Sequence, residues 1–567
     1  MASLTKKIVN GKPYYYLREC QRVGGKPKIV WTLYLGSVER MVERLMCPDP
    51  KEIDICEFGA SAACFDVAAA LDVAAIIDRH VPKRSSDSLS VGSYLLLAAL
   101  NRCVAPCSKA RLGAWYASSF VRRLIPASPS QLTSQRFWDN MNRVDEAQLR
   151  AIERELSHNA VSRFGLDLRC LLFDATNFFT FVDSFNPAPK LPQRGHSKEG
   201  RDNLRIVGLA LLVTSDGDVP LFHHTYPGNQ PDSVTFQSVA DELALRCRDL
   251  AGGVSDITLV FDKGNNSAEN LASAGRGPFH FVGSLVPTQH PELLAVPRRK
   301  MRRLDPETLP AVWSYRTRKK VFGCERTILC TFNQPLFDAQ QKTLRREIAK
   351  RNEKLEALRL SLVRQRAHPT PNQPTLASTR KNVESILKGR HMKTLFSAEV
   401  IVATDGLPAL RWEFHQRAWE TLRQTLLGKT ILFTDRDDWT DEQIVLAYRA
   451  QYHVEGAFRC MKDPRFLTFR PMFHWTDQKL RVHAFYCVLA LMIVSLLRRK
   501  LAHAGICLSP VDMLRRLTDI RQIALVYPAP PAAKTPFVRS KLSRTDDVQN
   551  KIIDALGLIR HLDAQAV

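Results

Sequence analysis

The sequence predicts an α/β protein built on a mixed β-sheet, and two observations predict this class. Apolar strand-like segments and helical segments follow one another between residues 166 and 290. Two of the strand-like segments, LRCLLFD and DITLVFD, each end on an aspartate, Asp174 and Asp262. The prediction includes a large basic insertion into this unit, a small β unit before it and a helical region between the two.

The N-terminal part, residues 1–50, is predicted to be the small β unit. From about Lys6 to Val38, apolar and polar residues alternate around the turn sequences NGK and GGK, and this pattern is typical of an antiparallel sheet. Basic residues interrupt the alternation.

Residues 51–165 change to helical periodicity, as in SYLLLAALNR and EAQLRAIERELSHNAVSRF. We expect a helical bundle here. It is a candidate for a domain that reads a DNA end, although a purely structural packing role explains the same pattern.

Residues 166–290 give the order of elements that defines the fold. Three strand-like segments, LRCLLFD, LRIVGLALLVT and VPLFHHTYP, precede a helix from Ser233 to Leu250. The strand DITLVFD, a short helix SAENLASAG and the strand PFHFVGSLV follow. The order β-β-β-α-β-α-β is that of ribonuclease-H-like folds, which place carboxylates on a central sheet.

Residues 291–426 are predicted to be the basic insertion. PRRKMRR and RTRKK flank Trp313 and Tyr315, and the helix KTLRREIAKRNEKLEALRLSLVRQR carries a coiled-coil-like stripe. We expect this stripe to pack within its own domain, because it is too short to indicate dimerisation. HPTPNQPT then predicts a linker.

Residues 427–505 are predicted to complete the catalytic unit, and residues 506–567 to form a helical tail interrupted by PAPPAAKTP. The apolar run from Ala484 to Leu497 is shorter than the ~20 residues that span a bilayer. We therefore expect a core helix and no membrane partner.

Composition favours a nucleic-acid partner. Lys and Arg number 81 against 57 Asp and Glu, a formal charge of +24, so the surface attracts polyanions. A basic enzyme or a protein binding acidic membranes would share this charge. The N-terminus resembles no secretory signal, and the 13 cysteines form no CxxC pairs, so we expect reduced thiols inside a cell.

Three acidic residues are the candidate catalytic and metal-binding groups. Asp174 and Asp262 end strands that would meet at one edge of the sheet, and Glu455 lies in AYRAQYHVEGAFRCMKD. Tyr448, Glu455 and Lys462 are seven residues apart, which on one helix would place them on one face. Val454, Ala457, Phe458 and Met461 would dock the opposite face.

Phosphodiester chemistry explains these residue types. It needs an activated oxygen nucleophile and a stabilised leaving oxygen, which two Mg²⁺ ions about 4 Å apart supply. Carboxylates are the hard ligands that Mg²⁺ prefers. With 57 acidic residues in the chain, each aspartate alone could equally be a turn cap, and the helix could be an ordinary exposed face.

These segments resemble the DDE transposases of bacterial insertion sequences, in the insertion-sequence-four superfamily with its Tyr, Arg, Glu, Lys signature. The first-aspartate motif corresponds to FDATNFF, the second to VFDKGNNS and the carboxylate helix to AYRAQYHVEGAFRCMKD. The block RGHSKEGRDNLRIVGLALLVTSDGDVPLFHHTYPGNQPDSVTF and the closing RPMFHWTDQKLRVHAFYCVLALMI are also similar.

The resemblance implies a homodimer that binds terminal inverted repeats in double-stranded DNA at the bacterial nucleoid, in the cytoplasm. It implies that Asp174, Asp262 and Glu455 hold two Mg²⁺ ions, with Mn²⁺ able to substitute, for strand cleavage and transfer to target DNA. The same resemblance assigns DNA contacts to the following residues: Tyr448, Arg449, Gln451, Arg459, Lys462 and Lys263.

Two departures from the family pattern concern phosphate binding. The signature arginine falls at Gln451, with Arg449 and Arg459 nearby, and Lys263 stands where an arginine commonly follows the second aspartate. Two alternatives to a transposase remain open at this point. One is a non-catalytic DNA-binding protein derived from a transposase, and the other is a ribonuclease-H-like nuclease without strand transfer.

Overall fold

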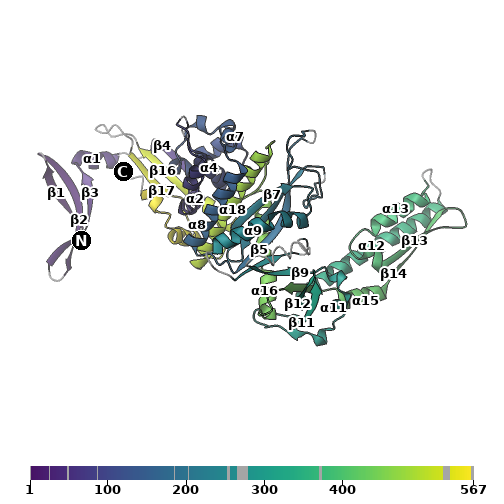
Figure 1. Cartoon of the computed structure of the whole chain (residues 1–567). Helices are drawn as coiled ribbons and strands as arrows, with labels where there is room; N and C mark the ends of the chain where they lie inside the picture. Colours follow the sequence, from purple (N-terminus) through teal and green to yellow (C-terminus); the bar gives the residue numbers. More distant parts are fainter. Residues whose placement is uncertain are drawn as a thin grey trace.

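The structure is a computed structural model. It describes residues 2–563 apart from 10, 24–25, 47–49, 86, 88, 184–185, 202, 252–255, 263, 265–278, 369–372 and 528–536. A central body carries the sheet and most helices (Figure 1), while the N-terminal strands project from one side and the insertion from the other.

The N-terminal unit is a three-stranded antiparallel meander in the order β1-β2-β3, followed by one helix. Its elements are β1 Ala2–Val9, β2 Lys12–Val23, β3 Lys26–Gly36 and α1 Val38–Met46. Gly11 in the first turn has φ +76°, a conformation that favours glycine. The predicted antiparallel unit is therefore present in this part of the chain.

The region from 51 to 165 is mainly helical but begins with a strand. Its elements are β4 Glu52–Glu57, α2 Gly59–Ala70, α3 Val73–His80, α4 Val91–Val104, η1 Lys109–Arg111, α5 Leu112–Ser118, α6 Val121–Leu124, η2 Pro129–Gln131, α7 Ser134–Met141 and α8 Glu146–Phe164. Helices α2 and α4 pack on a long helix from later in the chain, α18 Asp477–His503, and α4 is buried along nearly its whole length. Neither helix is free to enter a DNA groove.

The central sheet contains the five strands expected between 166 and 290. They are β5 Cys170–Phe179, β6 Ile206–Thr214, β7 Pro220–Pro227, β8 Ile257–Phe261 and β9 Phe279–Ser284, with α9 Asp232–Ala251 after β7. Strands β5, β6 and β7 are antiparallel, whereas β8 pairs parallel with both β5 and β9. The predicted mixed α/β fold is confirmed, and the strand order is consistent with a ribonuclease-H-like sheet. The predicted helix SAENLASAG lies outside the described residues.

The first part of the predicted insertion, from residue 291, extends the main sheet. Strands β10 Arg302–Arg303, β11 Val312–Val321, β12 Cys324–Asn333 and β15 Lys429–Thr434 join β9 and extend the main sheet to nine strands. The short segments η4 Pro287–Gln289, α11 Pro291–Leu294 and η5 Arg298–Lys300 precede them. β12 pairs with β15, about a hundred residues later, so local sequence could not indicate that the sheet continues.

The protruding part of the insertion has a hydrophobic core of its own. It contains α12 Gln334–Ala367, α13 Leu376–Ile386, α14 Met392–Leu395, β13 Phe396–Val402, β14 Pro408–Phe414 and α15 Gln416–Thr425. Ile348, Leu355 and Leu362 of α12 are buried in this core, so the stripe packs within its own domain as predicted. Half of the predicted linker HPTPNQPT, residues 369–372, lies outside the described residues.

The remaining elements return to the central body. They are α16 Asp441–Arg449, α17 Tyr452–Lys462, α18 Asp477–His503, α19 Pro510–Thr518, β16 Arg521–Tyr527, β17 Phe537–Leu542, α20 Asp547–Leu556 and α21 Arg560–Asp563. The tail predicted to be helical also contributes two strands, because β16 pairs with β4 on one side and β17 on the other. The segment PAPPAAKTP lies outside the described residues.

The apolar run after His483 lies in α18, which is buried in the protein core as predicted. Among the described residues, α18 is the one helix that is long enough and apolar enough to cross a membrane. However, 94% of its most apolar stretch is buried inside the protein. Helices α2 and α3 are long and apolar enough to cross a membrane only if they are taken together as one span, which is bent by 52°.

Buried cations line one side of α18. Arg102 donates to the carbonyl oxygens of Arg470 at 2.9 Å and Cys107 at 3.2 Å. The Nζ of Lys109 lies 4.2 Å from the ring centroid of Tyr486 and has no hydrogen-bond partner among the described residues. Burial, with the nearby charge of Arg102, lowers the pKa of Lys109 to about 7.

Replacement of Lys109 by Met is expected to stabilise the protein. The unfolded chain holds a proton on Lys109 up to the ordinary pKa near 10.5, so wild-type stability falls as the pH drops from about 10 to 7 and the cost is complete below 7. The variant should gain about 1 kcal/mol or more at pH 7.

Urea denaturation of both proteins at pH 7 and at pH 9.5 measures this effect. The advantage of Lys109→Met should shrink at the higher pH. An advantage that is absent at pH 7, or that grows with pH, would show that the buried ammonium is not a destabilising group.

Candidate active site

The two predicted aspartates lie side by side on the central sheet. β5 and β8 are parallel neighbours, and Phe173 pairs with Phe261 in their register. Asp174 follows Phe173 on β5, and Asp262 directly follows the end of β8, so the two residues emerge at the same level of neighbouring strands, which lie about 4.8 Å apart in a sheet. Both side chains are half-buried. The sheet therefore brings these two carboxylates together, as predicted.

Asp262 is held by hydroxyl groups from two other elements. The Ser284 Oγ at the end of β9 donates to Asp262 Oδ1 at 3.2 Å, and the Tyr448 hydroxyl on α16 donates to the same oxygen at 3.4 Å. Asp174 Oδ1 accepts from the backbone N–H of Ala175 at 2.8 Å. These bonds fix the orientation of both carboxylates.

The predicted carboxylate helix from Ala447 to Asp463 is two helices in the structure, so the single helical face is wrong. α16 ends at Arg449 and α17 begins at Tyr452. The Ala450 N–H donates to both Leu446 and Ala447, and the Gln451 N–H donates to Tyr448, which tightens the last turn of α16.

The break lets the two halves dock on different strands. α16 packs on β8, β9 and β15, whereas α17 packs on β5 and β6. The residues predicted to dock α17 are all buried: Val454, Ala457, Phe458 and Met461. Tyr448 consequently reaches the aspartate of β8, and Lys462 reaches β5.

Tyr448 donates to the second aspartate and lies within electrostatic range of the glutamate. Burial raises the pKa of Tyr448 to about 12, and the negative charges of Asp262 and Glu455 add to this effect. The phenol therefore stays protonated and can donate to Asp262. Glu455 lies in the first turn of α17 with its side chain exposed, within electrostatic range of Tyr448.

Lys462 lies beside the first aspartate. Its Nζ donates to Thr176 Oγ1 at 2.8 Å, two residues beyond Asp174 on β5. Burial lowers the pKa of Lys462, while Glu199 and then Asp174 oppose the shift. The ammonium therefore lies on the same side of β5 as Asp174, within electrostatic range of its carboxylate.

Sequence reasoning missed three cationic residues around Lys462. Lys198 donates from Nζ to the Ala175 carbonyl at 2.8 Å, and Arg470 donates to the Lys462 carbonyl at 2.9 Å. Arg201 and Arg470 lie over the Phe179 ring at 5.0 and 4.7 Å. Lys198 and Arg201 lie in the block RGHSKEGRD, and Arg470 begins RPMF. Both blocks resemble family motifs, but the resemblance does not indicate which side chains reach the site.

The other predicted DNA contacts are less closely tied to the aspartates. Arg449 and Arg459 are exposed, on α16 and α17. Gln451 is half-buried at the helix break, and its Nε2 has no hydrogen-bond partner among the described residues. Lys263 lies outside the described residues.

Metal ligation is supported by the aspartate pair more than by the full triad. Within the part of the chain that the structure describes, no three His, Cys, Asp or Glu side chains form a metal-binding group. Two adjacent carboxylates offer the hard oxygen ligands that suit a divalent cation such as Mg²⁺. Asp174 and Asp262 fit such an ion, whereas Glu455 does not form a group of three with them among the described residues.

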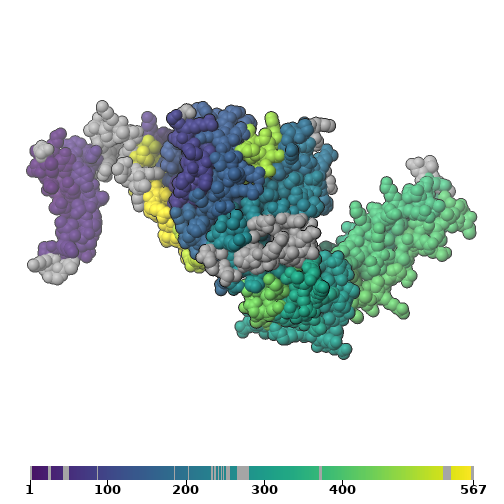
Figure 2. All heavy atoms as spheres, viewed as in Figure 1, coloured from purple at the N-terminus to yellow at the C-terminus, as the bar shows by residue number. Residues whose placement is uncertain are grey.

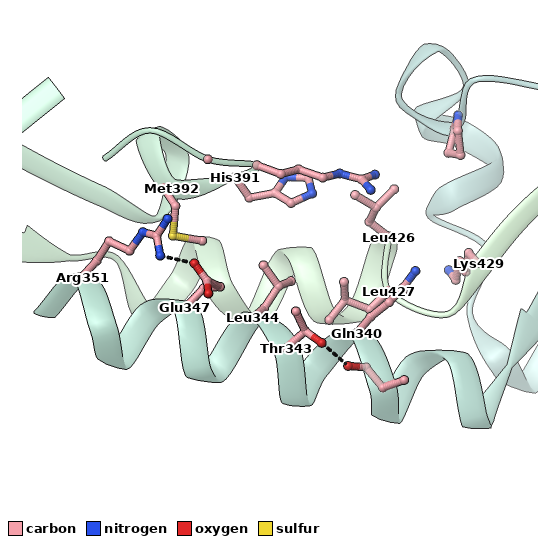
Figure 3. A pocket seen from close by; sticks show the side chains of 14 residues that line it. Gln340, Thr343, Leu344, Glu347, Arg351, His391, Met392, Leu426, Leu427 and Lys429 are labelled. Carbon is pink, nitrogen blue, oxygen red and sulfur yellow. Dashed lines mark hydrogen bonds and ion pairs between the residues drawn. The ribbon is translucent and has the colours of Figure 1, made fainter. Parts of the chain in front are cut away.

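A separate cavity of about 400 Å³ lies where the insertion leaves the main sheet. Its walls come from α12 and from the segments 389–392 and 426–429 (Figure 3), with Glu347 paired to Arg351. None of the predicted site residues lines it. This cavity is therefore distinct from the aspartate pair.

Comparisons with known proteins include a remote structural match. No family model matches the chain, and no curated protein sequence matches it. A solved structure, the cryo-EM structure of a piggyBac transposase synaptic complex with hairpin DNA, aligns over 80% of this chain and 78% of that chain. The sequence identity is 10% and the TM-score is 0.37. We therefore base the functional assignment on the chain's own residues.

Proposed function

We propose that the protein is a DNA transposase of the DDE class, which binds the terminal inverted repeats of an insertion sequence as a homodimer. It would cleave the element ends and transfer them to target DNA. The observation that carries the proposal is the pair of aspartates in register on two central parallel strands, with Tyr448, Glu455 and Lys462 on helices above them.

The proposal assigns the metal to the carboxylates. Asp174 and Asp262 would hold Mg²⁺, with Mn²⁺ as a substitute, and Glu455 would supply the third ligand from α17. Two bound Mg²⁺ ions would activate the attacking oxygen and stabilise the leaving oxygen of the phosphodiester.

The surrounding residues would position the DNA. Tyr448 keeps its proton at neutral pH and holds Asp262 by donating to it. Lys462, with Lys198 and Arg470 beside it, provides positive charge for non-reacting phosphate oxygens. Gln451 lacks the positive charge of the signature arginine, and the cations from these other segments would compensate for that loss.

Two rivals share parts of this description. A non-catalytic DNA-binding protein has no need of two carboxylates held side by side by hydroxyl donors, as Asp262 is here. A ribonuclease-H-like nuclease without strand transfer would use the same site, so only its products distinguish it. Inverted repeats and short flanking duplications around the gene would favour the transposase.

Removal of the metal is expected to stop the reaction. Duplex DNA carrying the flanking inverted repeat is labelled at the 5′ end of the strand whose 3′ element end is to be joined. It is incubated with the purified protein, Mg²⁺ and a supercoiled target plasmid. We expect cleaved ends and labelled target with Mg²⁺ or Mn²⁺, and neither product with EDTA. Cleavage without joining would favour the nuclease. DNA binding without either product would favour the non-catalytic protein.

A further inference from the structure

The N-terminal sheet is exposed on both faces. β1, β2 and β3 stand away from the central body (Figure 2). Large side chains are exposed on each face, such as Leu33 at 52% on one and Tyr34 at 44% on the other. A three-stranded sheet that buries neither face gains little stability from packing. Such a surface is typical of a binding site.

The two faces of this sheet differ in chemistry. Cross-strand partners lie on the same face of an antiparallel sheet, and Lys7 pairs with Tyr14, and Tyr16 with Tyr34. We call this side the tyrosine face. Its charged, hydroxyl and aromatic members include Thr5, Lys7, Lys12, Tyr14, Tyr16, Arg18, Arg22, Thr32 and Tyr34, and the register also places Val9, Cys20 and Ile29 on it. The opposite face carries Leu4, Leu17 and Leu33 in one row.

The tyrosine face is cationic and aromatic. The Tyr34 ring lies 5.0 Å from Tyr16 and 6.2 Å from Tyr14, and the Arg18 guanidinium lies 5.4 Å from the Tyr16 ring. The acidic residue of the three strands, Glu19, is on the other face, where Trp31 Nε1 donates to it at 2.7 Å. The tyrosine face therefore presents cations and hydroxyl groups with no acidic side chain from its strands.

We propose that the tyrosine face binds double-stranded DNA. β-ribbons fit the major groove of a duplex, and Lys, Arg, Thr and Tyr side chains donate hydrogen bonds to phosphates. The helices of residues 51–165 are poorer candidates, because α2 and α4 are packed on α18. The identification of this DNA as an element end rests on the proposed function.

The test compares two full-length double variants with equal charge changes. Lys7→Gln with Arg18→Gln alters the tyrosine face, and Lys6→Gln with Lys28→Gln alters the opposite face of the same sheet. Fluorescence anisotropy measures the Kd for a 30-base-pair duplex bearing the element end, at several salt concentrations without Mg²⁺. Circular dichroism and thermal melting verify that both variants fold.

We expect the tyrosine-face variant to bind about tenfold more weakly or worse, and to lose roughly two units of the salt slope, since each phosphate contact contributes about 0.9. The opposite-face variant should stay within about threefold of wild type. Equal losses in both variants, or none in either, would overturn the inference. So would a tyrosine-face variant that changes only self-association in sedimentation.

The two proposals fail in different ways. If the wild type binds DNA through the tyrosine face but never cleaves it with Mg²⁺, the transposase assignment fails while the binding face stands. If cleavage occurs and the tyrosine-face variant keeps wild-type affinity, the binding face is wrong and the catalytic assignment is unaffected.

Discussion

Replacement of Asp174 by Asn is expected to lower the rate of DNA cleavage on the order of a thousandfold or more. Asn keeps the shape of the side chain but removes the charge that would hold Mg²⁺ beside Asp262. Because both aspartates would act on one metal centre, Asp262→Asn should cause a similar loss. The double variant should be little worse than either single one.

Single-turnover cleavage of element-end DNA measures the rates, and anisotropy measures DNA affinity, which should change less than threefold. Asp167→Asn is the matched control, since Asp167 precedes the same strand and pairs with exposed Arg169. Its cleavage rate should equal that of wild type. Cleavage by Asp174→Asn at more than a tenth of the wild-type rate would contradict the assignment of this residue.

Replacement of Glu153 by Leu is expected to destabilise the protein by about 3–5 kcal/mol, the usual cost of leaving one member of a buried ion pair alone. Glu153 on α8 is 5% exposed and accepts from the backbone N–H of His223 at 2.8 Å. Arg246 on α9 is 2% exposed and donates to Glu153 at 3.1 Å. The substitution would leave the guanidinium of Arg246 buried without its anion.

Thermal melting and urea denaturation measure the loss. Glu242→Gln is the matched control, because Glu242 forms a more exposed pair with Arg150 on the same two helices, and it should cost less than about 1 kcal/mol. Adding Arg246→Met to Glu153→Leu should restore much of the stability. Similar losses for Glu153→Leu and Glu242→Gln would contradict the explanation.

The central strands were predictable because their signals are local. An apolar run that ends on a carboxylate, as at Asp174 and Asp262, indicates a buried strand whose last side chain is a candidate site residue. The pairing of β5 with β8 then follows from the parallel arrangement of the fold, and the register places both aspartates at one level.

The break between Tyr448 and Glu455 was not predictable from the sequence. The segment contains no proline, its Gly456 lies after the break, and its spacing suits a continuous helix. The break follows from docking, since α16 and α17 contact different strands of the sheet. Tertiary packing of this kind overrides a local pattern.

Long-range pairing explains the other differences. β12 joins the main sheet through β15, and β4 pairs with β16, so each strand's partner comes from a distant part of the chain. Lys198 and Arg470 reach Lys462 from separate loops for the same reason. Sequence periodicity describes single elements, and it contains little information about which elements meet.

The pairing of β4 with β16 has a consequence for synthesis of the protein. Cys56 and Gln522, which touch across these strands, are 466 positions apart. At ribosomal speeds of about 5–20 residues per second, β4 waits roughly 20–90 seconds for its partner to emerge. During that time the nascent chain presents an unpaired edge that includes Ile53 and Ile55, and chaperones that bind such segments would determine how much of it reaches the native state.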